Sequence, residues 1–522
     1  MMNYISLTVD YETWHPIPEG MAIDWEKDVF EPADQMMDMA GKVGVPLTFM
    51  VEMGEYSWLS KNDPPIARKM EDQWKRAVRE GQDIQLHLHP NWLPELGAKF
   101  ENGQWHWDWS KSKVQDYPGD LVQAIGRCKR TLEAVLRPVK ADYEVTSYRA
   151  GAYQAQPFER LYEALTANGI GCDSSVYQGG VSQERGYDYS QAHSNHQPYW
   201  AHGRDPQLEA AYGQESLLEI PIFTYSPGER WFLDGEEGHR LAGRLLGYYQ
   251  DSPVHSQTNE AYWWGRKALE ILFSLTWVRQ FFPWAMDRWE RKNSFRPGAG
   301  NDYFVMIGHT KGSHDYLKIG EQLKKLKEDG RFQFATLSEM AKAAKEDLRQ
   351  ESGRGKAELE KALGLMRETY LRLDPEKSQT SDDPEEILKG GYAWCWGYAI
   401  ALGHLLKKAG YEARWITLLA KGHPKGRGKD QVDSHEVIQT RIAGREVLMD
   451  PMANSLIPYS LEQVLRFPYL AAPKAQPDDR YRGREYQLYD TEFFYSRVFK
   501  YAVRKDPKER IWFWKRNRPR IS

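Results

Sequence analysis

The sequence predicts an α/β first domain, with a parallel sheet closed into a barrel or doubly wound, followed by a smaller α+β domain. From Tyr4 to about Met340, short apolar runs alternate with helical patterns, and this alternation is typical of parallel βα units. The length of 522 residues also exceeds the roughly 100 to 200 residues of an ordinary domain. We therefore expect two or three folding units.

The strands of the first domain are predicted at the apolar runs YISLTV, VPLTFMV, IQLHLH, VTSYRA, LLEIPI, YFVMIGH and FQFATL. Helical patterns such as EDQWKRAVREG separate these runs. In parallel βα folds the chemistry gathers at the carboxyl ends of the strands, so polar residues at those ends are candidate site residues. Between about 228 and 300 a long aromatic helical region interrupts the strands, and we expect a helical insertion near the site.

The domain boundaries follow from a change in pattern after the last predicted strand. We place the first domain at residues 1–345, a linker helix at 346–374, and the second domain with a C-terminal extension at 375–522. The linker stretch is charged and has no apolar face wide enough for a core. In the second domain a helical pattern stops at Gly410 and is followed by the strand-like runs ARWITLLA, HEVIQTRI and EVLMD.

The composition excludes several classes of protein. Hydrophobic residues make up 41% and charged residues 28%, as in folded globular proteins. The net charge of −4 argues against a nucleic-acid partner, and no stretch approaches the roughly 20 apolar residues of a membrane span. The start, MMNYISLTVD, lacks the features of a signal peptide, and three scattered cysteines argue against a disulfide framework. We therefore expect a cytoplasmic protein.

Polar residues follow the first and third predicted strands. Asp10 and Glu12 are two residues apart and so lie on one face of an extended chain, where two carboxylates suit a metal ligand and a proton acceptor. His87 and His89 have the same spacing, which lets both imidazoles reach one ion. Packing is the alternative for each histidine alone, but burying both without a partner would be unfavourable. We favour a metal site.

Two further residues at strand ends suit a hydrolase. Arg149 follows a strand and precedes small residues, so it could hold a carboxylate in its ionised state through a charge-assisted pair. His309 follows the apolar run FVMIG, where an imidazole could protonate a departing amine as a general acid. The alternative for each is a structural role.

Taken in order, LTVDYETW, IQLHLHP, SYRAGAY and FVMIGHTK resemble the motifs of the polysaccharide deacetylase family, also called carbohydrate esterase family four. The resemblance covers residues 1 to about 345. It implies an irregular (β/α) barrel and a metal-dependent hydrolase that removes N-acetyl groups from a carbohydrate or cell-envelope polymer.

The resemblance also implies roles for the individual residues. We assign the metal to Asp10, His87 and His89, with zinc as the expected ion because two imidazoles and one carboxylate form its usual catalytic ligand set. The same resemblance implies that Glu12 acts as the base, that Arg149 orients it, and that His309 is the acid.

The sequence departs from the family pattern at two places. The usual adjacent aspartates are replaced by Asp10, Tyr11 and Glu12, and the usual second histidine position holds Asn91, so that His89 serves from a different offset. Two alternatives follow from these departures. One is a cyclic amide hydrolase that needs no metal, and the other is a non-catalytic protein that binds a carbohydrate or a protein.

A second set of candidate residues lies in the second domain. Cys395 stands just before a predicted helix that begins near Trp396, and a helix N-terminus favours a thiolate. His435 begins a predicted strand and Asp450 ends the next one. A Cys, a His and an Asp can form a nucleophile, its base and the residue that orients the base.

The segments WCWGYAIALGHLLKKAGYEAR, DSHEV and LMDP resemble three motifs of the transglutaminase-like superfamily, over residues 375 to 465 approximately. The resemblance implies a papain-like α+β domain with amide acyl chemistry at Cys395, His435 and Asp450. The superfamily includes cross-linking enzymes, peptidases, amidases and inactive binding modules, so the substrate stays open, as does a protein partner for this domain.

Overall fold

The computed structural model divides the chain into two compact units, Met1–Leu348 and Arg349–Ser522, which we describe one at a time. The structure describes residues 2–507 except 14–22, 102–103, 109, 112, 183–184, 193, 195, 212–215, 226–276, 279–300, 312–315, 329, 331, 376, 422–431 and 472–493. The insertion expected at 228–300 therefore lies almost wholly outside the described residues. Within the described part of the chain, no helix has the length and apolar character needed to span a bilayer.

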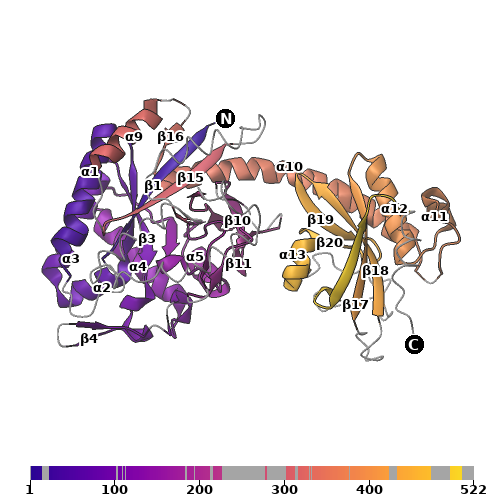
Figure 1. The fold of residues 1–522 in the computed structure, drawn as a ribbon, viewed down its shortest axis with the longest axis horizontal. Helices are drawn as coiled ribbons and strands as arrows, with labels where there is room; N and C mark the ends of the chain where they lie inside the picture. The colour runs from indigo at the N-terminus through magenta and orange to yellow at the C-terminus, as the bar shows by residue number, and fades with distance from the viewer. Residues whose placement is uncertain are drawn as a thin grey trace, which may run out of the picture. The chain divides into compact units, whose positions relative to one another are not determined.

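The first unit is built on a curled, mostly parallel sheet (Figure 1). Its strands pair in the order β11-β10-β12-β7-β6-β3-β2-β1-β15, with β16 also paired to β1. The bounds, in chain order, are β1 Asn3–Tyr11, β2 Leu47–Glu52, β3 Asp83–Leu88, β6 Ser147–Ala150, β7 Cys172–Asp173, β10 Tyr199–His202, β11 Asp205–Glu209, β12 Leu218–Glu219, β15 Asp302–His309 and β16 Phe332–Phe334.

Isolated bridges close this sheet into a barrel. Ile222, just after β12, forms parallel bridges with Tyr177 on one side and with Val305 of β15 on the other. The chain just after β12 therefore pairs with β15 at the opposite end of the sheet. The α/β barrel predicted from the alternating pattern is confirmed. Short two-stranded pairs lie outside the barrel: β4 Lys99–Glu101 with β5 Gln104–His106, β8 Val181–Ser182 with β9 Tyr187–Asp188, and β13 Thr224–Tyr225 with β14 Trp277–Val278.

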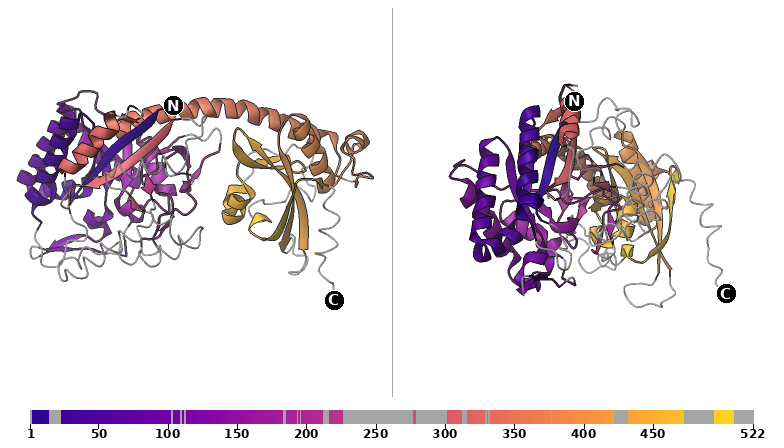
Figure 2. Two further views of the ribbon diagram at one scale, coloured as in Figure 1. Left: turned by 45° about the horizontal axis from the view of Figure 1, so that its top comes forward. Right: turned by 60° about the vertical axis from the view of Figure 1, so that its left-hand side comes forward.

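The helices near the N-terminus lie along one side of these strands (Figure 2). The helices of the first unit are α1 Glu31–Val43, α2 Met53–Asn62, α3 Pro64–Arg79, α4 Leu121–Leu136, α5 Glu159–Ala167 and α9 Tyr316–Glu328. A π-helical turn occupies Glu26–Phe30, and short 3-10 turns occupy Pro90–Trp92, Pro94–Leu96, Val114–Asp116 and Gly151–Tyr153.

Local sequence explains where these helices begin and end. Helix α4 begins after Asp120, whose side chain accepts a hydrogen bond from the backbone N–H of Gln123 at 3.0 Å. Helix α1 ends at Gly44, which has a φ of 70°, a left-handed conformation that glycine adopts without strain. These local signals fix where α4 begins and where α1 ends.

The core of the first unit explains the apolar strand runs. In β1, Leu7, Thr8 and Val9 are all fully buried, because helices or strands cover both faces of a parallel sheet. The Thr8 hydroxyl donates to the carbonyl oxygen of Met306 in β15 at 2.9 Å, which satisfies its polar atom inside the core. Such strands read as continuous apolar runs, as the sequence indicated.

A single helix, α10 Leu337–Arg372, begins in the first unit and ends in the second. The predicted linker helix spans 346–374, so the helix in the structure begins earlier, directly after β16. Its first turns carry Leu337, Met340 and Ala344, which are buried against the barrel, and that apolar start belongs to the core of the first unit.

The second unit consists of an antiparallel sheet packed against a helix. The strand order is β20-β19-β18-β17-β21, and the bounds are β17 Ala413–Lys421, β18 Val432–Ile442, β19 Arg445–Asp450, β20 Ser455–Ile457 and β21 Val498–Arg504. The helices are α11 Pro384–Gly390, α12 Cys395–Lys408 and α13 Leu461–Arg466, with a 3-10 turn at Pro468–Ala471. This α+β arrangement agrees with the class predicted for the second domain.

Helix α12 lies very close to strand β17. The indole N–H of Trp415 donates to the carbonyl oxygen of Ala399 at 3.0 Å, and a Cβ placed on Gly403 would lie 2.3 Å from the Trp415 ring. Gly403→Ala should therefore lower the free energy of unfolding by about 1 to 3 kcal/mol through overpacking. Thermal denaturation of the full chain checks this.

Gly364 in α10 supplies the matched control, because a Cβ there would meet no described residue within 4 Å. Gly364→Ala should raise stability by roughly 0.5 to 1 kcal/mol, since alanine loses less backbone entropy in a helix. Equal melting temperatures for the two variants would contradict the close packing of α12 on β17.

Candidate active sites

The first candidate site lies where the parallel strands of the barrel end. The pairing register places Asp10 of β1 beside His309 of β15. It also places His87 of β3 between Glu52 of β2 and Arg149 of β6. Residues from five distant parts of the sequence therefore meet at one edge, as expected for the carboxyl ends of parallel strands.

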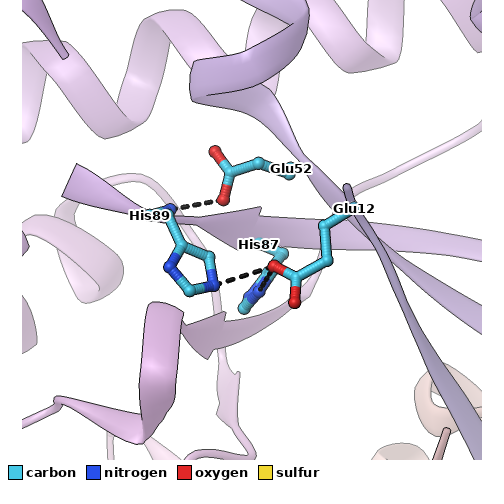
Figure 3. Close-up of side chains that lie close together, drawn as sticks. All are labelled: Glu12, Glu52, His87 and His89. Atoms are coloured by element: carbon cyan, nitrogen blue, oxygen red, sulfur yellow. Dashed lines mark hydrogen bonds and ion pairs between the residues drawn. The ribbon is translucent and has the colours of Figure 1, made fainter. Parts of the chain in front are cut away.

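Glu12 lies against both histidines (Figure 3). Its Oε2 atom is 3.1 Å from Nε2 of His87 and 2.8 Å from Nε2 of His89. All three side chains are buried. Two imidazole nitrogens thus converge on one carboxylate oxygen, in the manner of a ligand set that shares a central ion.

The donor atoms fit a divalent metal ion. One ligand atom from each of Glu12, Glu52, His87 and His89 can be chosen so that all lie within 4.8 Å of one another. The Nδ1 atom of His87 lies 2.9 Å from the carbonyl oxygen of Arg149. A carbonyl only accepts, so Nδ1 carries a hydrogen, and Nε2, which faces the Glu12 carboxylate, is the nitrogen that would hold a metal once it has given up its own proton. The first unit therefore contains a buried site suited to a metal.

Asp10 has a different environment. Its Oδ1 accepts a hydrogen bond from Nη1 of Arg149 at 2.7 Å, and Arg149 also donates through Nε to the carbonyl oxygen of Ser174 at 2.9 Å. Burial tends to raise the pKa of Asp10, but the attraction of Arg149, followed by that of the nearby histidines, outweighs it and lowers the pKa. Asp10 is therefore held as a carboxylate.

His309 completes this side of the site. Its Nε2 lies 3.6 Å from Oδ2 of Asp10 and 4.0 Å from Oε1 of Glu12. Burial lowers the pKa of His309 to about 4, so its imidazole is neutral near neutral pH. A neutral imidazole can accept a proton from the Asp10 carboxyl group and then donate it to another group.

The sequence did not reveal Lys311, which lies close to the same carboxylate. Its Nζ atom is 2.5 Å from Oε1 of Glu12. Burial tends to raise the pKa of Glu12, but Lys311 first and His89 second hold it well below the usual range. The ammonium group of Lys311 therefore balances the negative charge of Glu12 without a metal ion.

The positions of the predicted residues favour a change of roles. The sequence assigned Asp10 to the metal and Glu12 to proton transfer, but Glu12 is the carboxylate that contacts both histidines, while Asp10 contacts Arg149 and faces His309. Spacing alone could not distinguish them, because residues two apart share one face of a strand.

Glu52 and Lys311 were also missed, although both lie at or just past strand ends. Glu52 ends the run VPLTFMVE and Lys311 follows FVMIGHT, so the rule that singled out Asp10 and His309 could have identified them. A charged residue after a strand is common, and nothing in the sequence says which of them points inward.

The second candidate site brings the three predicted residues of the second unit together. Cys395 is the first residue of α12, His435 lies in β18, and Asp450 ends β19. Nε2 of His435 lies 2.5 Å from Oδ2 of Asp450. Burial tends to lower the pKa of His435, but Asp450 first, and a hydrogen bond with Cys395, raise it well above the usual value. The imidazole is therefore charged beside the sulfur.

The other oxygen of Asp450 fixes its orientation. Oδ1 accepts hydrogen bonds from the backbone N–H groups of Met452 and Ala453, both at 3.1 Å. Oδ2 is thus directed at His435, whose imidazole also forms a hydrogen bond with Cys395. The geometry is that of a nucleophile, a base and an orienting acid.

A thiol-directed reagent such as iodoacetamide should label Cys395 at neutral pH faster than Cys128 or Cys172. Burial raises the pKa of both other thiols to about 12, which leaves almost no thiolate to react. His435→Ala should slow the labelling of Cys395 by about tenfold, because it removes the cation that stabilises the thiolate. Mass spectrometry of peptides over time measures the three rates.

His404→Ala is the matched control, because His404 lies on the same helix α12 but pairs with Glu385 and not with the thiol. In this variant Cys395 should be labelled at the same rate as in the wild type. Equal, slow labelling of all three cysteines would exclude a catalytic thiol.

The first unit resembles solved structures at low sequence identity. A protein from Mycobacterium smegmatis assigned as a polysaccharide deacetylase shares 14% identity with a TM-score of 0.37, over 66% of this chain and 91% of that chain. Puue allantoinase shares 12% identity with a TM-score of 0.32, over 65% and 89%. A CE4 family pseudoenzyme from Bacillus anthracis shares 11% identity with a TM-score of 0.27, over 65% and 66%.

Sequence comparisons give a result for the second unit. A search of curated proteins gave no match. Residues 345–451 match the family model of the transglutaminase-like superfamily, and this span contains Cys395, His435 and Asp450. The chain therefore carries a transglutaminase-like domain at residues 345–451.

Proposed function

We propose that the first unit is a metal-dependent hydrolase that removes N-acetyl groups from a carbohydrate or cell-envelope polymer, and that the second unit is an amide acyl-transfer site. The observation that supports the first proposal most strongly is the contact of one Glu12 oxygen with both His87 and His89, beside a separate Asp10–Arg149 pair. The side chains that would bind the metal are therefore different from those that would transfer protons, and this division suits a metal-dependent hydrolysis.

Glu12, His87 and His89 would hold the ion in this proposal, and zinc suits two imidazoles and one carboxylate. When bound, a divalent cation there would supply Lewis-acid polarisation of the acyl carbonyl and of the attacking water. Asp10 takes the role of base, the reverse of the roles assigned from sequence. Arg149 keeps Asp10 ionised and fixes its orientation.

In the proposed reaction the proton passes through Asp10 and His309. Asp10 accepts a proton from water as the oxygen attacks the amide carbon. His309, whose Nε2 lies 3.6 Å from Asp10, relays that proton to the amine nitrogen when the carbon–nitrogen bond breaks. The products are acetate and a free sugar amine, and the resting imidazole is neutral again, which agrees with a His309 pKa of about 4.

In the second unit, the Cys395 thiolate attacks an amide carbonyl and forms a thioester. His435 protonates the departing nitrogen and Asp450 keeps the imidazole in place. Transfer of the acyl group to water or to an amine completes the reaction.

A second candidate function for the first unit is supported by Lys311. Its ammonium nitrogen lies 2.5 Å from a Glu12 carboxylate oxygen, so the negative charge of Glu12 is neutralised without a metal ion. A hydrolase of small cyclic amides that uses Lys311 and the histidines alone would suit this arrangement. The third alternative, a binding module, would use the same groups without turnover.

The metal proposal predicts different effects for ligand and proton-transfer variants. Glu12→Gln and His87→Ala should abolish binding of about one zinc ion per chain. Asp10→Asn and His309→Ala should retain the ion but lose about 100- to 10,000-fold in turnover of an N-acetylated oligosaccharide, because these residues only move protons. Metal analysis and acetate release measured on the same protein samples check both effects.

Cys395→Ala is the control, since its site lies in the other unit and deacetylation should be unchanged. Loss of metal in Asp10→Asn with retention in Glu12→Gln would restore the roles expected from sequence. Acetate release by the metal-free wild type would contradict metal dependence.

Lys311→Met separates the two hydrolase proposals by the sign of its effect. If Glu12 binds a metal, removal of the competing ammonium charge should tighten zinc binding by at least about tenfold, because even in water two unit charges about 3 Å apart attract by about 1.4 kcal/mol. If the site works without metal, the same change should lower hydrolysis. Zinc titration with a competing chelator measures the affinity, and Lys113→Met, with a surface lysine outside this cluster, is the control.

A further inference from the structure

Helix α2 begins directly after β2, and its first turn carries two buried acids. Glu52 is the residue that precedes the helix and Glu55 is in its first turn. Both carboxyls are buried, and within the described part of the chain neither forms an ion pair.

Glu52 binds two backbone N–H groups. Oε1 accepts from Gly54 at 2.7 Å, which caps the helix, and Oε2 accepts from the backbone N–H of His89 (Figure 3). Both oxygens are therefore committed to the backbone. The second bond ties the end of β3, where His89 lies, to the start of α2.

Glu55 makes the corresponding contact on the other side of the site. Its Oε2 accepts a hydrogen bond from the backbone N–H of Thr13 at 3.2 Å. Thr13 directly follows Glu12. One helix start thus holds the backbone beside two of the groups that converge on the candidate metal position.

The close approach of the helix start supports this arrangement. A Cβ on Gly54 would lie 2.8 Å from Oε1 of Glu52 and 2.9 Å from Cβ of Trp92, in the turn that follows His89. Glu52 and Glu55 therefore reach the backbone of the two segments that carry candidate ligands, at His89 itself and at Thr13 beside Glu12.

We propose that Glu52 and Glu55 are positioning residues that hold the backbone at His89 and Thr13, and thereby fix the separation of Glu12 and His89 that a metal ion needs. The inference rests on the proposed metal-dependent function. Groups that orient metal ligands from outside typically change metal affinity by about 10- to 100-fold when replaced. Glu52 and Glu55 should act through this affinity and not through the chemistry.

The two residues should respond differently to the same substitution. Glu52 uses both oxygens as acceptors, and glutamine can replace only one of them, so Glu52→Gln should weaken zinc binding about 10- to 100-fold. Glu55 uses one oxygen, while the other has no hydrogen-bond partner among the residues that the structure describes, so Glu55→Gln should bind zinc as the wild type does. Glu55→Leu should weaken zinc binding about 10- to 100-fold.

Zinc affinity by chelator competition and the visible absorption spectrum of the cobalt(II) protein test the proposal in the full chain. The cobalt spectrum reports the number and type of ligands, which positioning residues leave unchanged. Asp120→Leu is the matched control, because it removes the acid that caps α4, away from the site, and should not change zinc affinity. Far-UV circular dichroism confirms that each variant is folded, and the Glu55 pair carries the test if Glu52→Gln does not fold.

Weaker zinc binding in Glu52→Gln and Glu55→Leu, with wild-type affinity in Glu55→Gln and an unchanged cobalt spectrum, would support the proposal. A cobalt spectrum altered by Glu52→Gln would make Glu52 a ligand and overturn it. Wild-type affinity in Glu52→Gln and Glu55→Leu would overturn the positioning role alone. A wild-type protein that binds neither zinc nor cobalt would overturn the proposed function itself.

Discussion

The register of the parallel strands is the constraint on which the first site depends. Pairing of β1 with β15 sets Asp10 beside His309, and pairing of β3 with β6 sets His87 beside Arg149. Because side chains alternate between faces, a shift of one residue in any of these strands would turn its functional group away from the others. Polar contacts inside the sheet oppose such a shift, since the Thr8 hydroxyl would lose its acceptor on β15.

Charge compensation is the second requirement, because the site gathers acids inside a barrel. Arg149 is fully buried and offers its guanidinium to Asp10 and to the backbone of Ser174, so neither the cation nor the anion is left unpaired. Lys311 does the same for Glu12. Removal of Arg149 would leave Asp10 as a buried carboxylate without a cation, and Asp10 would then take up a proton. Lys311 neutralises Glu12 in this structure, so in the proposed function it would compete with a metal ion for that carboxylate.

The sequence predicted the strands, the barrel and the residues that meet at its edge, because apolar runs and the polar residues at their ends are local features. It could not predict which carboxylate faces the histidines, since Asp10 and Glu12 share a face and their roles depend on Arg149 and Lys311 from distant strands. Glu52 was missed for a related reason. It accepts a hydrogen bond from the backbone N–H of His89, and a backbone contact leaves no mark in the sequence of the partner. The sequence also identified Cys395, His435 and Asp450, which lie together in the second unit, because they stand at a helix start and in or at the end of strands; their catalytic roles stay a prediction.

The two units set the charge of a histidine in opposite ways. His309 lies 3.6 Å from a carboxylate that is already paired with Arg149, so burial dominates and the pKa falls to about 4. His435 lies 2.5 Å from Asp450, whose other oxygen accepts hydrogen bonds from two backbone N–H groups, so attraction dominates and the pKa rises. A neutral imidazole suits a relay that must first receive a proton. A charged imidazole suits a resting thiolate, because it stabilises the sulfur anion and already carries the proton that the leaving nitrogen needs.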